Sequence, residues 1–352
     1  MVQRNNLPVF KESNSLETEI LRFFIEPAEE RFESLALAIF DYQRHENPVY
    51  AQYCEFLGTP ERIDSWERIP AVPQIAFKRS DIRSFPAQLT KIEFRTSGTT
   101  GEGHGKHFFP SLQLYEAAVQ HGWDYFRLPR HRLILLMQHP NDAPFSSLSR
   151  MGGMLTHFER DRFFIGKNGA VELDRLRENL TDRQGPWTLF GTALAFLNLL
   201  EVAPDLHLEL PAGSVLMETG GFKGSRRHIG KLALYEELSL RFGIAFDSIW
   251  NEYGMTELSS QFYSRGVERS HRPPPWMKFQ IIDPETNEKA LAGKIGLLRI
   301  VDLANLWSVM AVLTQDLAVA QPDGGFLLLG RDPAALPRGC SRAVDQLMRS
   351  AQ

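Results

Sequence analysis

Cysteine is scarce in this chain of 352 residues, which contains only Cys54 and Cys340. So few cysteines argue against a disulfide framework or a cysteine-based zinc site, and we expect each to be a free thiol. The ten histidines show no H-E-x-x-H spacing or similar ligand pattern. The composition therefore argues against disulfide-rich proteins and against histidine- or cysteine-based metalloproteins.

Long apolar runs and an excess of positive charge are also missing. No uninterrupted apolar stretch approaches the roughly 20 residues that cross a bilayer, and the N-terminal residues lack the apolar core of a signal peptide. With 39 basic and 43 acidic residues the formal net charge is −4, which argues against a sequence-independent nucleic-acid binder. We expect a cytoplasmic protein with no membrane span and no nucleic-acid partner.

The remaining composition, 43% hydrophobic, is enough for a large core, and the patterning divides the chain into three segments. Residues 1–75 form a helical N-terminal layer, because apolar residues recur three and four apart in "RFESLALAIFDYQRHE". Residues 76–270 alternate strand-like runs ("LILLM", "SVLMETGG", "DSIWNEYG") with helical stretches, which predicts a layered α/β sheet. Residues 271–352 follow the break "HRPPPW" with short β-type runs and predict a small β-rich lobe.

A loop rich in glycine and hydroxyl groups, "TSGTTGEGHGK" from Thr96 to Lys106, follows the strand-like "KIEF". Glycines allow backbone N–H groups to turn toward an anion, and hydroxyls and a lysine add further donors. The spacing matches neither the P-loop, because His107 follows Lys106, nor the Rossmann G-x-G-x-x-G pattern. The alternative is a solvated surface turn.

Three further short motifs carry polar groups suited to ligand binding. "NEYGMTE" (251–257) lies at the end of a predicted strand, where α/β proteins bind ligands. "TQD" (314–316) and "GRD" (330–332) lie in the predicted β lobe. Taken singly, each is an ordinary strand end or turn.

Taken in order, the four motifs resemble those of the acyl-adenylate-forming superfamily, which includes acyl-CoA ligases, luciferases and peptide-synthetase adenylation domains. Further stretches, "IPAVPQIAFK", "SSLSRMGG", "METGGFKG" and "GR" followed by "RGCS", are similar to the LuxE-like acyl-protein synthetases of bacterial bioluminescence operons. This resemblance covers residues 69–341. It implies an adenylate-forming α/β large domain with the helical N-terminal layer, the small β-rich lobe and a truncated mobile C-terminal domain.

The resemblance also implies a chemistry. A carboxylate attacks the α-phosphate of ATP, pyrophosphate leaves, and donors and a magnesium ion must meet the charge that gathers in the transition state. It assigns the β- and γ-phosphates to Thr96, Ser97, Gly98, Thr99, Thr100 and Gly101, with Lys106 as the loop cation.

The same resemblance gives the remaining motifs roles at the nucleotide. Tyr253, beside Gly254, would stack on adenine, Thr256 would bind the α-phosphate and Glu257 would hold Mg²⁺. Asp316 would accept both ribose hydroxyls, and Arg331 would support the ribose or a phosphate. Gly220 and Gly221 would lie against the base or the acyl group.

Each assignment has a structural alternative. Tyr253 would otherwise be a core aromatic, Glu257 a solvated helix start, Arg331 an exposed residue at a lobe hinge, and "TGGFKG" (219–224) a strand-end turn. The apolar stretch 187–200 would line an acyl tunnel or form plain core.

Two departures from the family pattern stand out. The loop segment "GEGHGK" is longer than the usual G-x-P-K and lacks its proline. Only about twenty residues follow Arg331, whereas typical members continue with a mobile domain of roughly a hundred residues that carries a lysine for the reacting carboxylate. That lysine has no assignment here.

The expected function is ATP- and Mg²⁺-dependent adenylation of a carboxylic acid, by the resemblance a fatty acid, with transfer of the acyl group to a thiol. The acceptor is open between Cys340, an acyl carrier protein, a partner acyl-CoA reductase and coenzyme A. Cys340 is flanked by Arg338 and Arg342, which favour a thiolate, although a small apolar filler is the structural alternative. A different class, a nucleotide-binding scaffold without catalysis, is disfavoured by the intact Glu257 and Asp316.

Overall fold

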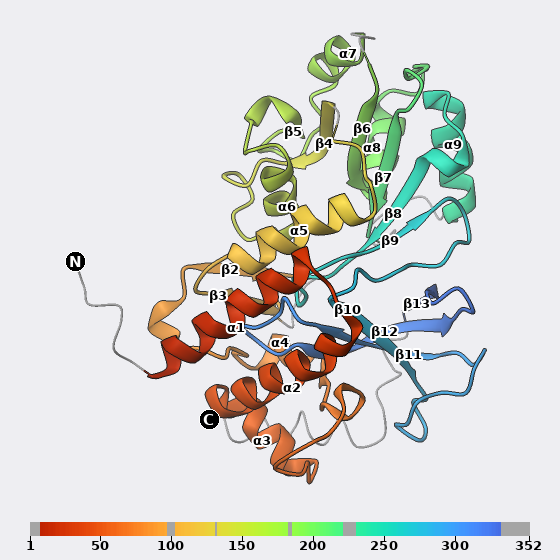
Figure 1. The fold of residues 1–352 in the computed structure, drawn as a ribbon. Helices are drawn as coiled ribbons and strands as arrows, with labels where there is room; N and C mark the ends of the chain where they lie inside the picture. The colour runs from red at the N-terminus through yellow and green to blue at the C-terminus, as the bar shows by residue number, and fades with distance from the viewer. Residues whose placement is uncertain (1–7, 97–102, 131, 182–184, 221–229, 332–352) are drawn as a thin grey trace. The chain divides into compact units, whose positions relative to one another are not determined.

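The computed structural model describes residues 8–96, 103–130, 132–181, 185–220 and 230–331 (Figure 1). The chain forms two compact units, each assembled from separate segments. The first unit contains Met1–Gly122, Met255–Ser260 and Pro273–Gln352, and the second contains Trp123–Gly254 and Gln261–Arg272. The three segments inferred from sequence patterning stay a prediction about folding units.

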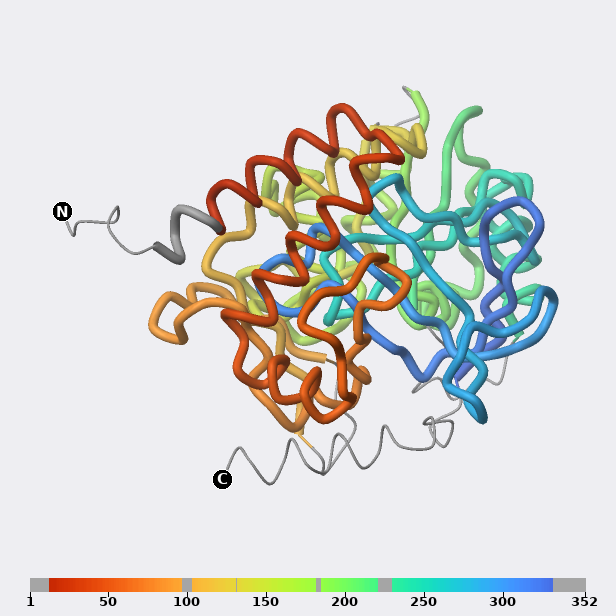
Figure 2. The backbone as a smooth tube through the Cα atoms, turned by 60° about the horizontal axis from the view of Figure 1, so that its bottom comes forward, coloured from red at the N-terminus to blue at the C-terminus, as the bar shows by residue number. Residues whose placement is uncertain are grey.

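The first unit begins with helices, as the apolar periodicity predicts. Helices α1 and α2 run side by side (Figure 2), with Phe23 and Phe32 in edge-to-face contact at a centroid distance of 6.3 Å. The third helix starts where Asn47 accepts a hydrogen bond from the backbone N–H of Tyr50, with Pro48 in the first turn. The helices that begin in this unit are α1 (Pro8–Ile25), α2 (Glu29–Glu46), α3 (Pro48–Phe56), α4 (Ala76–Arg79) and α5 (Gln113–Tyr125), with 3₁₀ turns at Trp66–Arg68 and Ala87–Leu89.

The first unit also contains a five-stranded sheet in the order β1-β12-β11-β10, with β13 paired to β12. Pairing is antiparallel except between β1 and β12. The predicted β-rich C-terminal lobe is confirmed, and "TQD" lies inside a strand. The strands are β1 (Val72–Pro73), β10 (Met277–Ile282), β11 (Gly296–Asp302), β12 (Ala311–Ala320) and β13 (Phe326–Arg331), and a separate hairpin is formed by β2 (Ile92–Arg95) and β3 (Lys106–Phe109).

The second unit is built on a six-stranded sheet in the order β5-β4-β6-β7-β8-β9, parallel except for the last pair. Helices alternate with its strands, so the predicted layered α/β class is confirmed. The strands are β4 (Arg132–Gln138), β5 (Phe163–Ile165), β6 (Trp187–Thr192), β7 (Val215–Thr219), β8 (Ile249–Tyr253) and β9 (Phe262–Arg265). The helices are α6 (Ser147–Leu155), α7 (Leu173–Thr181), α8 (Ala193–Val202) and α9 (Lys231–Phe242), with 3₁₀ turns at Arg160–Arg162 and Phe246–Ser248.

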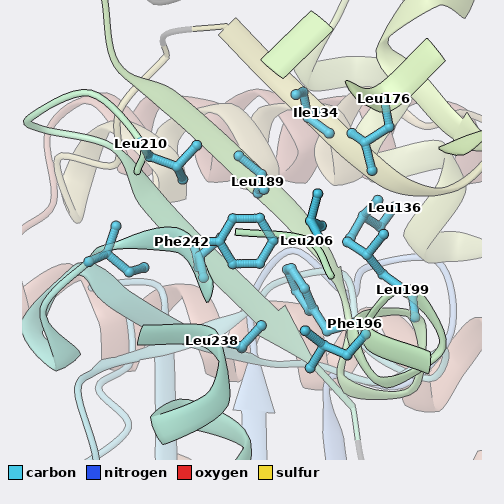
Figure 3. Close-up of a cluster of buried hydrophobic side chains, with 14 of the residues drawn as sticks. Ile134, Leu136, Leu176, Leu189, Phe196, Leu199, Leu206, Leu210, Leu238 and Phe242 are labelled. Atoms are coloured by element: carbon cyan, nitrogen blue, oxygen red, sulfur yellow. The ribbon is translucent and has the colours of Figure 1, made fainter. Parts of the chain in front are cut away.

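The core of the second unit lies between this sheet and helices α7, α8 and α9. Figure 3 shows Phe196, Leu238 and Phe242 gathered with strand residues such as Leu189. The apolar stretch 187–200 is strand β6 followed by helix α8, because Thr192 caps the helix by accepting from the N–H of Ala195. Its side chains supply much of this cluster, as the core alternative predicts.

Helix α6 packs on alternate residues of β4, and Gly152 allows the close approach. A Cβ added at Gly152 would lie 2.8 Å from Met137 Sδ and 3.0 Å from Leu135 Cδ1. The small residue Gly152 therefore allows the close packing between helix and strand. None of the helices in the described ranges combines the length and apolarity needed to cross a membrane.

A matched pair of leucines in α9 tests the core. Leu238 is fully buried and Leu240 is 70% exposed on the same helix. Leu238→Ala is expected to lower the free energy of unfolding by about 2–5 kcal/mol, because it leaves a cavity. Leu240→Ala should change it by no more than about 0.5 kcal/mol. Urea denaturation measures both, and equal losses would show that α9 does not pack as described.

Candidate active site

The glycine-rich loop begins and ends at a closed hairpin in the first unit. The backbone N–H of Thr96 donates to Gly105 O at 2.9 Å, and the N–H of Gly105 donates to Thr96 Oγ1 at 2.8 Å. Lys106 is exposed at the start of β3. Its backbone lies opposite that of Arg95 in the register of the β2–β3 hairpin. The other predicted loop residues, Ser97, Gly98, Thr99, Thr100 and Gly101, lie outside the described residues.

Glu257 lies beside the base of this hairpin and is 2% exposed. Its Oε1 accepts a hydrogen bond from Gln74 Nε2 at 3.1 Å, whereas its buried Oε2 has no hydrogen-bond partner among the described residues. A Cβ added at Gly105 would lie 3.5 Å from Glu257 Oε1. Burial raises the pKa of the Glu257 carboxyl. The alternative of a solvated helix start is therefore wrong.

Two buried side chains fix the backbone that carries Glu257. Asp302 Oδ2 accepts the N–H groups of Ser259 and Ser260, at 3.0 and 2.8 Å. Asn305 Nδ2 donates to the carbonyl of Glu257 at 2.9 Å, and Asn305 Oδ1 accepts from Ser259 Oγ. Turn residues that would otherwise lose their hydrogen bonds on burial are thus satisfied, and Glu257 is held in one orientation.

His107 links the hairpin to the same segment. Its Nδ1 lies 2.8 Å from the carbonyl oxygen of Thr256, which can only accept, so Nδ1 carries the proton. The ring is fully buried against Phe77 and Phe109. Burial lowers the pKa of His107 to about 4, so the neutral ring makes this contact at neutral pH.

Asp316 and Arg331 are register partners on β12 and β13. A β-bulge follows this pair, and Gly330 takes a φ of 125°, which a residue with a side chain rarely adopts. The Arg331 Nε lies 3.9 Å from Asp316 Oδ1, while its Nη2 donates to Gln74 Oε1 at 2.7 Å and to Gln315 Oε1 at 3.0 Å. The structure thus brings Glu257, Asp316 and Arg331 together around Gln74.

The remaining predicted residues lie in the second unit. Gly220 directly follows β7, and Tyr253 is the last residue of β8. Because these two strands are parallel neighbours, both residues lie at the carboxyl ends of the strands. Tyr253 contacts Phe262 and His271 with ring centroids 6.0 and 5.9 Å apart. A Cβ at Gly254 would meet the end of the Glu252 side chain, which would have to shift to admit it. Gly221 and Cys340 lie outside the described residues.

Gln74, His107, Asp302 and Asn305 are site residues that the sequence reasoning missed. Gln74 lies inside the quoted stretch "IPAVPQIAFK", where a polar residue directly after a short apolar run was the available signal. His107 was noted only because it breaks the P-loop pattern. Neither Asp302 nor Asn305 belongs to a motif that marks it.

The described residues contain no group of three or more histidine, cysteine or acidic side chains arranged for a metal ion. A closed protein cage for a metal is therefore not formed by them. The one uncommitted oxygen of buried Glu257 fits a hard cation that takes its other ligands from water and substrate oxygens, as Mg²⁺ commonly does.

Comparisons with known proteins agree with this fold. No protein-family model matches the chain. A long-chain-fatty-acid–luciferin-component ligase of Aliivibrio fischeri is 23% identical over 331 residues, covering 87% of this chain and 85% of the relative.

Among solved structures, a 2-hydroxyisobutyryl-CoA ligase in complex with 2-HIB-AMP and CoA matches with a TM-score of 0.60 and 15% identity, covering 87% of this chain and 76% of that one. An ATP-bound RpMatB-BxBclM chimera matches with a TM-score of 0.50 and 18% identity, and this chain spans about half (47%) of its length. The fold is that of the acyl-adenylate-forming ligases. Within that class the predicted resemblance to the LuxE-like acyl-protein synthetases is confirmed by the similarity to the luciferin-component ligase.

Replacement of His107 tests its neutral, buried state through the pH dependence of stability. Its pKa of about 4 in the folded chain lies below the unfolded value, so protonation favours unfolding. Titration of His107 does not lower the free energy of unfolding above about pH 6.5. As the pH drops from there toward 4, the titration lowers the free energy of unfolding by about 3 kcal/mol in all. In His107→Asn, whose amide N–H can replace Nδ1–H, this part of the acid sensitivity should vanish.

The measurement is the free energy of unfolding from urea denaturation at pH 4.5, 5.5, 6.5 and 7.5. His45→Asn, at a histidine whose side chain is 82% exposed, is the control and should follow the wild type. An unchanged slope in His107→Asn would mean that His107 is not buried in its neutral form.

Proposed function

We propose that this protein activates a carboxylic acid with ATP, forming an acyl adenylate and releasing pyrophosphate, and then transfers the acyl group to a thiol. The observation that carries the proposal is the buried Glu257, with one uncommitted oxygen, beside the base of the glycine- and hydroxyl-rich loop. Asp316 and Arg331 are connected to it through Gln74. A buried carboxylate with an unsatisfied oxygen is costly to maintain, and a cation bound with ATP would offset that cost.

In this proposal each group of the first unit has one task. Glu257 holds Mg²⁺, which when bound neutralises phosphate charge. Backbone N–H groups and hydroxyls from Thr96 to Gly101, with Lys106, bind the β- and γ-phosphates, and Thr256 donates to the α-phosphate. Asp316 accepts the ribose hydroxyls and Arg331 supports them.

In the second unit, Tyr253 supplies an aromatic face for adenine, and the small residues Gly220, Gly221 and Gly254 allow close approach of a ligand to the backbone. The rings of Phe262 and His271 meet the Tyr253 ring at interplanar angles of 54° and 66°, so neither is stacked flat on it.

The names of the relatives support the substrate class. The Aliivibrio fischeri relative is named for a long-chain fatty acid, which favours a fatty acid as the substrate here. A solved relative was crystallised with an acyl-AMP and coenzyme A, and another with ATP. Coenzyme A is therefore the principal alternative to a protein thiol as acyl acceptor, with an acyl carrier protein or a partner reductase as further candidates.

Pyrophosphate exchange into ATP across a panel of carboxylic acids tests the reaction, and Glu257→Gln tests the site. The wild type should release AMP and pyrophosphate. The amide has the size of the carboxylate but not its charge, so exchange should fall by about 100-fold or more, the scale of losing one electrostatic contact to a reacting group. Glu67→Gln, at an exposed carboxylate of the same unit, should retain wild-type exchange.

Two outcomes would contradict this proposal. Release of ADP and phosphate by the wild type rules out adenylation. Unfolding of Glu257→Gln, seen as a large drop in melting temperature, would make the carboxylate structural.

The acceptor thiol is tested with Cys340→Ser. If Cys340 receives the acyl group, its thiolate attacks the carbonyl carbon of acyl-AMP, a C–S bond forms, and AMP leaves as the C–O bond breaks. With radiolabelled fatty acid and ATP, Cys340→Ser should keep pyrophosphate exchange but lose the hydroxylamine-sensitive label on the chain. A label that persists in the variant, or acyl-CoA formed in place of any label, would exclude Cys340.

Cys54→Ala is the matched control, because the environment of Cys54 disfavours reaction. Its thiol is buried, and burial raises its pKa to about 11, so it stays protonated at neutral pH. The label should therefore remain in Cys54→Ala.

A further inference from the structure

Gln74 is held rigidly at the point where the first-unit sheet meets helix α4. It directly follows β1, and its backbone N–H donates to the carbonyl of Leu313 on β12 at 2.8 Å. Its own carbonyl accepts from the N–H of Phe77 at 3.2 Å, and the residue is 8% exposed. Because both backbone groups are bonded, the side chain projects from a fixed position.

Both ends of the Gln74 amide are used, and by groups of opposite charge. Nε2 donates to the carboxylate of Glu257 at 3.1 Å, and Oε1 accepts from the guanidinium of Arg331 at 2.7 Å. A carboxylate side chain has no donor for Glu257, and an amine has no acceptor for Arg331. A side-chain amide offers both on one planar group, and these two partners fix which way it points.

We propose that Gln74 is a positioning residue that couples the cation-binding carboxylate Glu257 to the ribose-binding pair Asp316 and Arg331. This rests on the proposed function for the roles of those three residues. Holding Oε1 of Glu257 leaves Oε2 for the cation, and holding Arg331 keeps its guanidinium beside Asp316. Loss of the amide therefore weakens the binding of both the cation and the nucleoside. By linkage, a bound cation then increases the affinity for the nucleoside less, and a bound nucleoside increases the affinity for the cation less.

A merely structural role for Gln74 gives a different pattern. If the amide only satisfies a buried carboxylate, its loss affects Glu257 and overall stability but not the affinity for a nucleoside that lacks phosphates. Adenosine binding is therefore the informative readout, because adenosine cannot bring a cation with it. It also does not depend on catalytic turnover.

The experiment compares Gln74→Met, which keeps the length of the side chain but removes donor and acceptor, with the wild type. Calorimetry measures the affinity for adenosine, and for ATP with Mg²⁺ and with EDTA. Each lost hydrogen bond to a charged group corresponds to roughly a 10-fold effect. Adenosine should bind about 10-fold more weakly, and the factor by which Mg²⁺ tightens ATP binding should fall about 10-fold. Glu257→Gln should reduce only the Mg²⁺ factor.

Gln280→Met is the matched control. Gln280 is another buried glutamine of the same sheet, and its Oε1 accepts from Arg299 at 2.6 Å. This variant should keep both affinities within twofold. In the double variant with Glu257→Gln, Gln74→Met should still weaken adenosine binding but reduce the Mg²⁺ factor no further.

The outcomes separate the two proposals. Wild-type protein that binds MgATP and exchanges pyrophosphate, together with a Gln74→Met variant whose adenosine affinity is unchanged, overturns the coupling role and leaves the proposed function standing. Wild-type protein that neither binds MgATP nor exchanges pyrophosphate overturns both. Equal losses in Gln280→Met would also overturn the role of Gln74, because they would trace the effect to general loosening of the sheet.

Discussion

The burial of the Glu257 carboxyl group is the constraint on which the rest of the first unit depends. Removing a carboxylate from water is costly unless partners compensate, and only one of its two oxygens is bonded by the described residues. The raised pKa follows from this incomplete compensation. A cation bound at Oε2 would supply the partner that this oxygen lacks among the described residues. The site is thus destabilised as it stands and gains most from the ligand it is proposed to bind.

A carboxylate kept in that state has to be held by a rigid surround. The carbonyl of Glu257 is bonded by Asn305, and Gln43 of α2 in turn bonds the carbonyls of Asn305 and Leu306 and the N–H of Met310. Asp302 holds the next turn. These buried polar groups satisfy one another, as such networks must to avoid a net cost. The N-terminal helices therefore contribute to the site indirectly, through the loop that follows β11.

Local patterning in the sequence predicts the elements with strong periodicity and the motifs with dense polar composition. The N-terminal helices, strand β4 and the α/β alternation are of the first kind, and "TSGTTG", "YGMTE" and "TQD" are of the second. Gln74 and His107 belong neither to a strongly periodic element nor to a motif of dense polar composition. Gln74 bonds Glu257 across 183 positions, and His107 bonds Thr256 across 149. A single polar residue has no period, and its partner is defined only once the chain has folded.

Strand β12 explains why these scattered residues meet. Its first half pairs with β1 through Val312 and Leu313, which places Gln74, while its second half carries Asp316 and pairs with β13, which places Arg331. A shift of one residue in the β12–β13 pairing would turn Arg331 to the other face of the sheet, and a shift in the β1–β12 pairing would displace Gln74. The bulge between the pairs Leu317–Gly330 and Ala318–Leu328 shifts the register so that Arg331 lies opposite Asp316, and a glycine at position 330 accommodates the φ of 125°. Gly330 and the amide of Gln74 thus both help to hold Arg331 beside Asp316. The register of β12 with its two neighbours fixes this arrangement.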